Sequence, residues 1–355
     1  MFYLPNAAID VIKIFALGTL SFLAAIWLTP LLTHYLYKYR LWRKEVRTKA
    51  IDGKELTYFQ KFHTQGETQI PRFGGLLIWI IPLILAVIFW LLSSVDVWWF
   101  HKLNFLSRNQ TWLPFFALIS ASILGLADDT LQVVGKGKYI GGGLSLKKRL
   151  LLMGLIGLAG GWWFFEKLGW STIHIPAMGD VGIGILYIPL FILVTMATYS
   201  GGVIDGLDGL AGGVFASIFA AFAGIALFRG QIDLAAFCAV ILGALLAFLW
   251  YNIPPARFYM GETGIMGLTA ALTVVAFLTD SVLVLPIIGF LLVIESGSVI
   301  LQLLSKKFRK KKIFLAAPIH HHFEAKGWPA YKITMRFWII GVVAAIVGIA
   351  IRLLG

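Results

Sequence analysis

The chain is divided into ten apolar segments by polar loops, and this division constrains its fold more than any other feature. Crossing a hydrocarbon core of roughly 30 Å takes about 20 residues of helix, a length that most of the segments reach. Helices are expected because lipid offers the backbone no hydrogen-bond partners and the segments lack the alternation of barrel strands. The segments cover residues 11–37, 74–94, 112–126, 150–165, 183–199, 210–228, 234–251, 264–279, 282–304 and 335–354.

The composition is that of an integral membrane protein rather than a soluble one. Hydrophobic residues make up 59% of the 355 residues and charged residues only 13%, with a mean hydropathy of +0.86. The first segment has no small-residue cleavage site, so we expect a retained helix rather than a signal peptide. The single cysteine, Cys238, excludes a disulfide framework. The sequence predicts one integral membrane domain over residues 1–355.

The basic residues are distributed unequally between the loops. Twenty-four of the 30 Lys and Arg residues lie in, or directly border, the loops after the odd-numbered segments, and only four lie in the other loops. Because basic loops stay in the cytoplasm, the odd-numbered loops are predicted to be cytoplasmic and both termini periplasmic. The net charge of +13 then follows from topology and from attraction to anionic lipids or substrates, without a nucleic-acid partner. The predicted fold is an all-α polytopic protein of about ten transmembrane helices.

Two acidic pairs lie in the predicted cytoplasmic loops. Asp128 and Asp129 directly follow the third segment, where a helix C-terminus disfavours anions unless a cation or metal balances them. Asp205 and Asp208 lie three residues apart in a glycine-rich loop without a basic residue, so they share one side if the loop is helical. Solvated loop carboxylates remain an alternative for the first pair. Further along, Lys147-Lys148-Arg149 is interpreted as the basic start of a helix.

The loop between the seventh and eighth segments combines several kinds of polar side chain. Asn252, Arg257, Tyr259 and Glu262 fall within eleven residues, and two prolines break the helix among them. A rigid turn with an interfacial aromatic is the alternative interpretation. The loop shares its predicted face with the acidic pairs, and this favours a functional role.

The last loop carries a basic run between residues 306 and 312 and then His320-His321-His322. The basic run is assigned to anchoring at lipid headgroups. Consecutive helical positions do not face one site, and neither a cysteine nor a second histidine has the spacing of a zinc site. Hydrogen bonding to phosphate or sugar is therefore favoured over metal ligation. Together with carboxylates from three loops, these side chains indicate Mg²⁺-dependent handling of a phosphate ester on the cytoplasmic face.

These residues resemble the polyprenyl-phosphate N-acetylhexosamine-1-phosphate transferases, over nearly the whole chain from Pro71-Arg72-Phe73-Gly74-Gly75 to the last segment. The most specific matches are Asp128-Asp129, Asp205-Gly206-Leu207-Asp208-Gly209-Leu210-Ala211 and Pro318-Ile319-His320-His321-His322-Phe323-Glu324. The triple histidine, followed by Gly327-Trp328-Pro329 and Arg336-Phe337-Trp338, points to the muramoyl branch. The fold of that family, ten helices with both termini periplasmic, agrees with the topology inferred from charge.

The resemblance implies transfer of phospho-MurNAc-pentapeptide from UDP-MurNAc-pentapeptide to undecaprenyl phosphate, with Mg²⁺, giving lipid I and UMP. It implies a multi-pass protein of the bacterial cytoplasmic (inner) membrane that acts in peptidoglycan synthesis among membrane lipids; a homodimer stays open. The implied catalytic residues are Asp128, Asp129, Glu262 and His320, with Glu262 and Asp128 as metal ligands. The implied substrate-binding residues are Arg72, Asp205, Asp208, Asn252, Tyr259, Gln302, His321 and His322, with Tyr259 stacking on uracil.

Three positions depart from the usual family pattern. Glu262 stands where an aspartate is usual, Gly202-Val203-Ile204 replaces Asn-Leu-Thr, and the first-loop motif at residues 71–75 looks more like the GlcNAc-1-phosphate branch. Two alternatives therefore stay open: a sister enzyme that transfers GlcNAc-1-phosphate, and a lipid or solute transporter. A transporter is expected to place ionisable residues near the midplane of its helices, where this chain has only Glu295.

Overall fold

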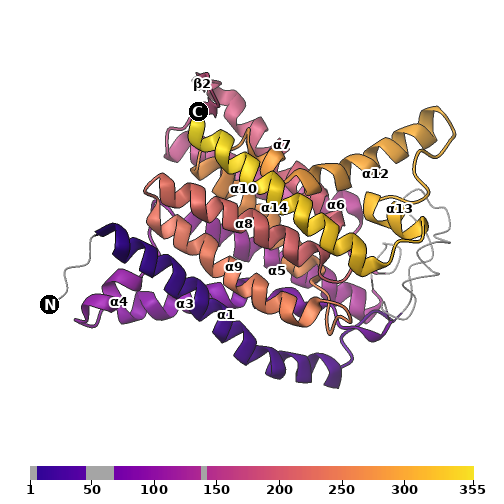
Figure 1. Ribbon diagram of the computed structural model, residues 1–355, viewed down its shortest axis with the longest axis horizontal. Helices are drawn as coiled ribbons and strands as arrows, with labels where there is room; N and C mark the ends of the chain where they lie inside the picture. Colours follow the sequence, from indigo (N-terminus) through magenta and orange to yellow (C-terminus); the bar gives the residue numbers. More distant parts are fainter. Residues whose placement is uncertain (1–5, 45–67, 137–141) are drawn as a thin grey trace.

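The computed structural model describes residues 6–44, 68–136 and 142–355 and consists almost entirely of helices (Figure 1). In these ranges nine helices are long and apolar enough to cross a membrane, so the predicted helical membrane fold is confirmed. The long helices are α1 (Asn6–Lys38), α3 (Leu76–Leu92), α5 (Trp112–Val134), α6 (Leu146–Trp162), α7 (Tyr187–Gly201), α8 (Leu210–Phe228), α9 (Ile232–Asn252), α10 (Gly261–Leu278), α12 (Phe290–Phe308) and α14 (Ala330–Leu354). The short helices are η1 (Phe73–Gly75), α4 (Trp98–Leu103), η2 (Trp163–Lys167), η3 (Gly184–Leu186), η4 (Gly202–Ile204), α11 (Leu285–Ile288) and α13 (Ile319–Ala325).

The ninth predicted segment, 282–304, is not one continuous helix. The chain breaks at Gly289, between α11 and α12, and α12 then leaves the bundle toward α13 (Figure 1). Glu295, Lys306 and Lys307 all lie in the 19 residues of α12, so this helix is less apolar than the nine. Of the ten predicted membrane segments, nine thus correspond to apolar helices of the described residues, and the remaining one is broken into α11 and α12.

Helix α10 forms the centre of the bundle. It packs against α3, α5, α6, α7 and α8, and 94% of its apolar window is buried inside the protein. Glycine permits the closest approach, between α5 and α10. A Cβ atom on Gly125 would come within 2.6 Å of the Thr263 nitrogen and would overlap the Glu262 carbonyl. The first turn of α10 is therefore held directly against α5.

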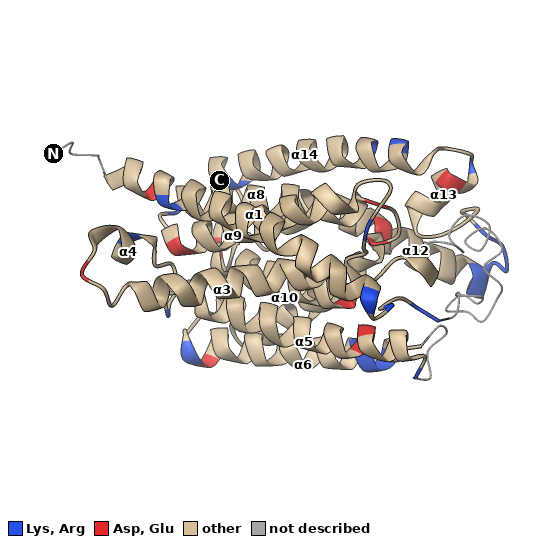
Figure 2. Cartoon of the chain, turned by 90° about the horizontal axis from the view of Figure 1, so that it is seen from below, with Lys and Arg blue, Asp and Glu red and all other residues tan. Residues whose placement is uncertain are grey.

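The charged residues lie toward the two ends of the bundle, and the middle has almost none (Figure 2). At one end Lys13 of α1 pairs with Asp233, and Arg229 pairs with Asp280 at 2.6 Å, beside the last residues of α14. At the opposite end α5, α7 and α9 finish and α6, α8 and α10 begin. The loops after the third, fifth and seventh predicted segments therefore meet at one end, as their alternation requires.

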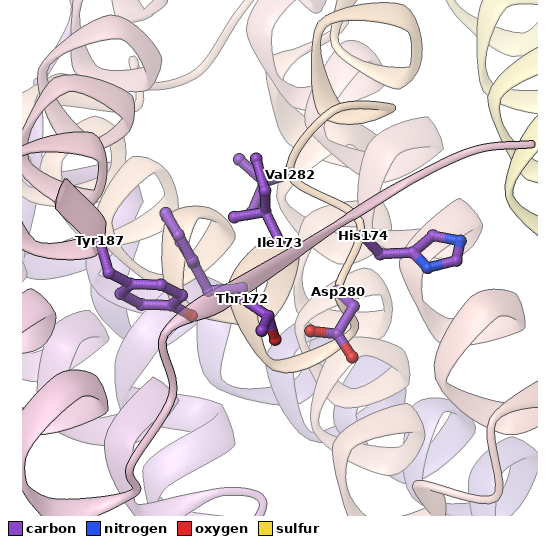
Figure 3. A pocket seen from close by; sticks show the side chains of 7 residues that line it. Thr172, Ile173, His174, Tyr187, Asp280 and Val282 are labelled. Atoms are coloured by element: carbon purple, nitrogen blue, oxygen red, sulfur yellow. The ribbon is translucent and has the colours of Figure 1, made fainter. Parts of the chain in front are cut away.

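A small antiparallel hairpin, β1 (Thr172–Ile175) and β2 (Gly179–Gly182), was not expected from the sequence. Beside it lies a hollow with no room for a water molecule, lined by the residues drawn in Figure 3: Thr172, Ile173, His174, Tyr187, Phe277, Asp280 and Val282. Asp280 follows the last turn of α10, whereas Glu262 lies in its first turn. A helix of 18 residues is about 27 Å long, so this hollow is remote from the acidic loops.

Candidate active site

Three carboxylates from two helices converge where α5 ends and α10 begins. Asp128 and Asp129 are fully buried, and Glu262 lies in the first turn of α10. The sequence placed the acidic pair in a loop after residue 126, but α5 continues to Val134 and the pair lies inside the helix. The helix continues because arginines from other segments balance both charges. We call Asp128, Asp129 and Glu262, with Arg72 and Arg149, the carboxylate cluster.

Arg149 joins two of the three carboxylates. Its Nη2 lies 2.9 Å from Oδ2 of Asp128, and its Nη1 donates to Oε1 of Glu262. Its Nε donates to the Leu144 carbonyl at 3.1 Å, which fixes the plane of the guanidinium. The hydroxyl of Tyr199, at the end of α7, donates to Oε2 of Glu262 at 3.4 Å. Helices α5, α6, α7 and α10 therefore all contribute to this one site.

Further hydrogen bonds, from Gln132 and the Leu144 backbone, fix the Asp128 carboxylate. Gln132, one turn later on α5, donates from Nε2 to Oδ2 of Asp128 at 2.6 Å. The Oε1 of Gln132 in turn accepts from Nε of Arg43 at 2.9 Å. The other carboxylate oxygen of Asp128 accepts from the Leu144 backbone nitrogen. The orientation of the Asp128 carboxylate is thus fixed on both oxygens.

Asp129 has one satisfied and one unsatisfied oxygen. Its Oδ2 accepts from the Thr263 nitrogen at 2.9 Å, and its Oδ1 lies 3.6 Å from Nε of Arg72. Oδ1 is buried and has no hydrogen-bond partner in the described part of the chain. Buried polar atoms are nearly always paired, so an orphaned carboxylate oxygen is a mark of a functional site. Gly261 passes over this carboxylate with φ of +72°, where a side chain would be strained and would clash with Asp129.

Glu295 and His320 form a second buried pair. Nδ1 of His320 lies 2.9 Å from Oε2 of Glu295, and both side chains have no exposed surface. Nε2 of His320 has no hydrogen-bond partner within residues 6–44, 68–136 and 142–355. A Cβ atom on Gly206 would overlap this nitrogen and lie 3.2 Å from Nε2 of His321. Two imidazole edges therefore lie against the loop that holds Asp205 and Asp208.

The other two histidines, His321 and His322, differ in direction. Nδ1 of His321 lies 2.9 Å from Oε2 of Glu324, whereas Nδ1 of His322 accepts from the Leu315 nitrogen at 3.1 Å. Burial lowers the pKa of His322, and the nearby Lys326 lowers it further. His322 therefore contacts the loop before α13, and the structure does not bring it to Gly206 with the other two.

Several residues assigned to substrate hold the backbone of the site in this structure. The amide of Asn252 accepts from the Gly209 nitrogen at 3.0 Å and donates to the Phe258 carbonyl at 2.8 Å. Asp208 accepts from the Ala256 nitrogen at 3.1 Å through Oδ2. These contacts join the loop after η4 to the loop after α9, so the second acidic loop is positioned by the segment that leads to Glu262.

Gln302 and Tyr259 are also held by backbone contacts. The Gln302 side chain donates to the Phe314 carbonyl at 2.9 Å and accepts from the nitrogens of Ile313 and Phe314, which ties α12 to the loop before α13. The backbone of Tyr259 is fixed by the Pro71 carbonyl at 2.8 Å and by the Gly74 nitrogen at 2.9 Å. Its side chain is half-buried, as is that of Asp205, and the Tyr259 ring remains a candidate to meet a nucleotide.

The sequence did not single out Arg149, Gln132, Arg43 or Tyr199, and it noted Glu295 only as an exception. The role of Arg149 was not apparent because it ends the basic run Lys147-Lys148-Arg149, which the sequence analysis interpreted as the basic start of a helix. Glu295 did carry a signal, because an ionisable residue in an otherwise uncharged membrane segment usually has a function.

The carboxylate cluster has the donor chemistry of a magnesium site. In the described ranges no group of three or more His, Cys, Asp or Glu side chains could hold a metal ion. Mg²⁺ needs only one or two carboxylates when substrate phosphates supply the other oxygens. Asp128 and Glu262 meet the same guanidinium, so their oxygens already converge on one positive charge. These residues therefore fit Mg²⁺ held jointly with a phosphorylated substrate.

Comparison with known proteins supports an enzyme of this kind. A model of glycosyl transferase family 4 matches residues 111–280. A protein of Geobacillus sp. (strain WCH70) is 35% identical over 338 residues, covering 94% of this chain and 96% of its own length. Proteins of Anoxybacillus flavithermus and Methylacidiphilum infernorum are 36% and 33% identical, covering 81% and 87% of this chain and 85% and 86% of their own lengths.

Each of these three relatives is named phospho-N-acetylmuramoyl-pentapeptide-transferase. The similarity extends far beyond the sequence motifs, and the residues matched by the family model, 111–280, include α5, α6, α7 and α10. The family resemblance inferred from the motifs is thereby confirmed. The chain belongs to the phospho-N-acetylmuramoyl-pentapeptide-transferase family and is a membrane-embedded phosphoglycosyl transferase of peptidoglycan synthesis.

Proposed function

We propose that the protein transfers phospho-MurNAc-pentapeptide from UDP-MurNAc-pentapeptide to undecaprenyl phosphate, forming lipid I and releasing UMP. The observation that carries the proposal is the carboxylate cluster, in which three carboxylates and two arginines are gathered at one end of an apolar bundle. The names of the relatives supply the identity of the transferred group. A bacterial inner membrane fits the three bacterial relatives reported above.

Charge neutralisation is the main task that we assign to the cluster. A phosphate monoester has a second pKa near 6, so the lipid phosphate is mostly dianionic at pH 7 and needs no strong general base. The obstacle is repulsion between this dianion and the anionic pyrophosphate of the donor. Arg149 and Arg72 place fixed positive charge in a buried site, where it acts more strongly than in water. We favour direct displacement at the β-phosphate in one step.

Asp128 and Glu262 are the residues that we expect to hold Mg²⁺. When bound, Mg²⁺ supplies charge neutralisation and alignment of the phosphates. Gln132 and the Leu144 nitrogen keep the Asp128 carboxylate in a fixed orientation, and Tyr199 does the same for Glu262. The Glu262 side chain is one methylene longer than that of the usual aspartate. It accepts a hydrogen bond from Arg149 and so connects α10 to α6.

His320 is assigned to the sugar or phosphate of the donor. Glu295 fixes the ring through Nδ1, which leaves Nε2 directed at the Asp205–Asp208 loop. His321 contributes a second imidazole to the same place. The excess of Lys and Arg in the loops at this end supports a cytoplasmic location for the site, where a UDP-sugar is made.

The test is UMP release by the purified protein, with undecaprenyl phosphate as acceptor and Mg²⁺ present. We expect release with UDP-MurNAc-pentapeptide and little with UDP-GlcNAc. The reverse preference would overturn the assigned sugar but keep the reaction class. The first-loop motif gives no argument for GlcNAc in this structure. A Cβ atom would lie 2.8 Å from the Tyr259 carbonyl oxygen at Gly74 and 2.6 Å from the Met260 carbonyl oxygen at Gly75, so packing alone accounts for both glycines.

A further inference from the structure

Arg43, just beyond the end of α1, is a buried cation at the edge of the carboxylate cluster. Only 3% of it is exposed, although arginine is rarely buried to this extent without a partner. The Leu41 carbonyl accepts from the Arg72 nitrogen at 3.2 Å, so the segments that hold the two arginines lie side by side. Arg72 meets Asp129 on α5, whereas Arg43 meets Gln132, almost one turn further along the same helix.

The contact between Arg43 and Gln132 fixes the direction of the Gln132 amide. Nε and Nη2 of Arg43 both donate to Oε1 of Gln132, Nε at 2.9 Å. A guanidinium has donors only, so the amide oxygen must face it and the amide nitrogen must face the other way. That nitrogen, Nε2, donates to Oδ2 of Asp128 at 2.6 Å. A flipped amide would set its NH₂ group against the guanidinium and its oxygen against the carboxylate, so the contacts admit one orientation.

The relay from Arg43 through Gln132 to Asp128 is closed to solvent. Gln132 is 1% exposed and Asp128 has no exposed surface. The turn at Gly142 and Gly143 covers both: a Cβ atom on Gly143 would lie 2.8 Å from Cγ of Gln132 and 2.9 Å from Oδ1 of Asp128. Both glycines have positive φ, +88° and +90°, where a side chain would be strained. The two side chains therefore depend on protein partners for their hydrogen bonds.

Arg43 supplies positive charge in a different way from Arg149. Arg149 contacts Asp128 directly, so its charge is set against the carboxylate itself. Arg43 acts through an amide, which is neutral and leaves the negative charge of Asp128 available to a metal ion. Hydrogen bonds in a chain polarise one another, so the guanidinium strengthens the bond from Nε2 to the carboxylate.

We propose that Arg43 is a positioning residue for the phosphate transfer, acting through Gln132 on Asp128. The guanidinium holds the amide with its donor toward Asp128, and this keeps the carboxylate in the orientation in which it meets Mg²⁺. The proposal rests on the proposed function, since it assigns a role in that reaction. Loss of a group that orients a metal ligand typically lowers metal affinity or activity by about 10–100-fold.

Gln132→Glu separates positioning from a purely structural role. Glutamate has the length of glutamine and pairs with Arg43 at least as well, so a residue that only anchored Arg43 would tolerate the change. In the relay, however, the new carboxylate faces Asp128 with no hydrogen to donate. We expect the melting temperature in detergent and the KM for undecaprenyl phosphate to stay at wild-type values. The rate of UMP release should fall about ten-fold or more, and the Mg²⁺ concentration for half-maximal rate should rise.

Arg43→Gln and Gln132→Met give a second measurement, because each breaks the relay at a different place. Each should lower the rate about ten-fold or more, and the double variant should lose no more than the stronger single variant, since one interaction is removed in all three. Arg43→Lys keeps the charge and should recover part of the loss. Lys44→Gln is the matched control: Lys44 is the next residue, is exposed, and should be replaceable without effect.

Binding of Mn²⁺ in the presence of UMP, measured by electron paramagnetic resonance, does not depend on turnover. Arg43→Gln should bind Mn²⁺ about ten-fold more weakly than the wild-type protein, and Lys44→Gln as tightly. Wild-type Mn²⁺ affinity in Arg43→Gln, or wild-type UMP release by Gln132→Glu, would overturn the positioning role. Strictly additive losses in the double variant would overturn it too, because the two residues would then act separately. If the wild-type protein releases no UMP with either sugar, the proposed function fails, and Mn²⁺ binding still decides the relay.

Discussion

Arg149 pairs with two carboxylates of the candidate site at once. One guanidinium meets a fully buried carboxylate, Asp128, and a second from another helix, Glu262. Breaking a buried ion pair from one side typically destabilises a protein by about 3–5 kcal/mol, because the remaining charge is left uncompensated. Lysine could not replace it, since a point charge lacks the planar fork that contacts two carboxylates at once. Arg149, together with Arg72, thus holds the three carboxylates of the carboxylate cluster close together before any substrate binds.

The first prediction concerns these carboxylates. Asp128→Asn, Asp129→Asn and Glu262→Gln should each lower the rate of UMP release by about 10² or more, the scale for losing one preorganised electrostatic group. Glu262→Asp should keep some activity because the carboxylate remains. Asp180→Asn, on the hairpin at the opposite end, is the control and should behave as wild type. Near-normal rates in all three cluster variants would show that the reaction takes place elsewhere.

The second prediction separates nucleotide binding from chemistry at Tyr259. Stacking of a base on an aromatic ring contributes roughly 1–3 kcal/mol. Tyr259→Ala should therefore raise the KM for the UDP-sugar about ten-fold or more, whereas Tyr259→Phe should stay close to wild type. The backbone contacts of this residue to Pro71 and Gly74 survive in both variants, so a loss in the alanine variant reports the ring. An alanine variant with a wild-type KM would reduce Tyr259 to an interfacial anchor.

The acidic residues of the site could be predicted from the sequence, but their partners could not. Asp128, Asp129 and Glu262 were recognisable because a carboxylate beside an apolar segment is costly without a role. Arg149 and Glu262 are 113 residues apart, and no local pattern relates them. The same holds for Glu295 and His320, which lie on different helices and 25 residues apart. Pairings of this kind depend on how the helices pack.

Among the helices, α12 and α13 decide how the histidines are presented, and this gives the third prediction. Charge-assisted hydrogen bonds contribute about 1.5–3 kcal/mol, so His320→Ala and His321→Ala should each lower activity roughly ten-fold or more at every Mg²⁺ concentration. His322→Ala should be the most tolerant, because its ring contacts the backbone of Leu315 rather than the Gly206 loop. Rescue of His320→Ala at high Mg²⁺ or Mn²⁺ would move that histidine to the metal ligands.

The contact between α5 and α10 gives the fourth prediction. Gly125→Ala forces a methyl group against the Glu262 carbonyl, and overpacking of this kind typically destabilises by about 1–3 kcal/mol. The first turn of α10 should shift, so both the melting temperature in detergent and the rate of UMP release should fall. Gly224→Ala, where the Cβ meets open space, is the control and should lower neither. Equal behaviour of the two variants would argue against close packing at Gly125.

The helices themselves followed from the apolar segments, whereas their ends and breaks did not. The sequence ended the third segment at residue 126 because polar residues follow, but Arg72 and Arg149 balance Asp128 and Asp129 and the helix continues to Val134. The break at Gly289 did have a local signal, because Pro286 and Gly289 both disfavour a continuous helix, but the apolar composition of the segment hid it. The hairpin at 172–182 is too short to stand out beside the long apolar segments.

For the whole protein, the charge distribution predicts which end faces the cytoplasm, and the sequence allows a clean test. The only cysteine, Cys238, is fully buried in α9, so the wild-type protein should not react with a membrane-impermeant maleimide. Met178→Cys, in the hairpin, should react on intact cells, because Met178 is 77% exposed at the end predicted to be periplasmic. Lys312→Cys, exposed in the loop before α13, should react only after the membrane is opened. The opposite pattern would invert the topology.

The deep burial of α10 also has a consequence for biogenesis. The helices packed around it, α3, α5, α6, α7 and α8, all precede it in the chain, and so does α9, which leads into it. Proteins are made from the N-terminus, so the helices that surround α10 are synthesised before it leaves the ribosome. Asp128 and Arg149 are then in place more than a hundred residues before Glu262 is synthesised. The carboxylate cluster is therefore completed only when α10 docks, and the Glu295–His320 pair is added later still, when α12 and α13 follow.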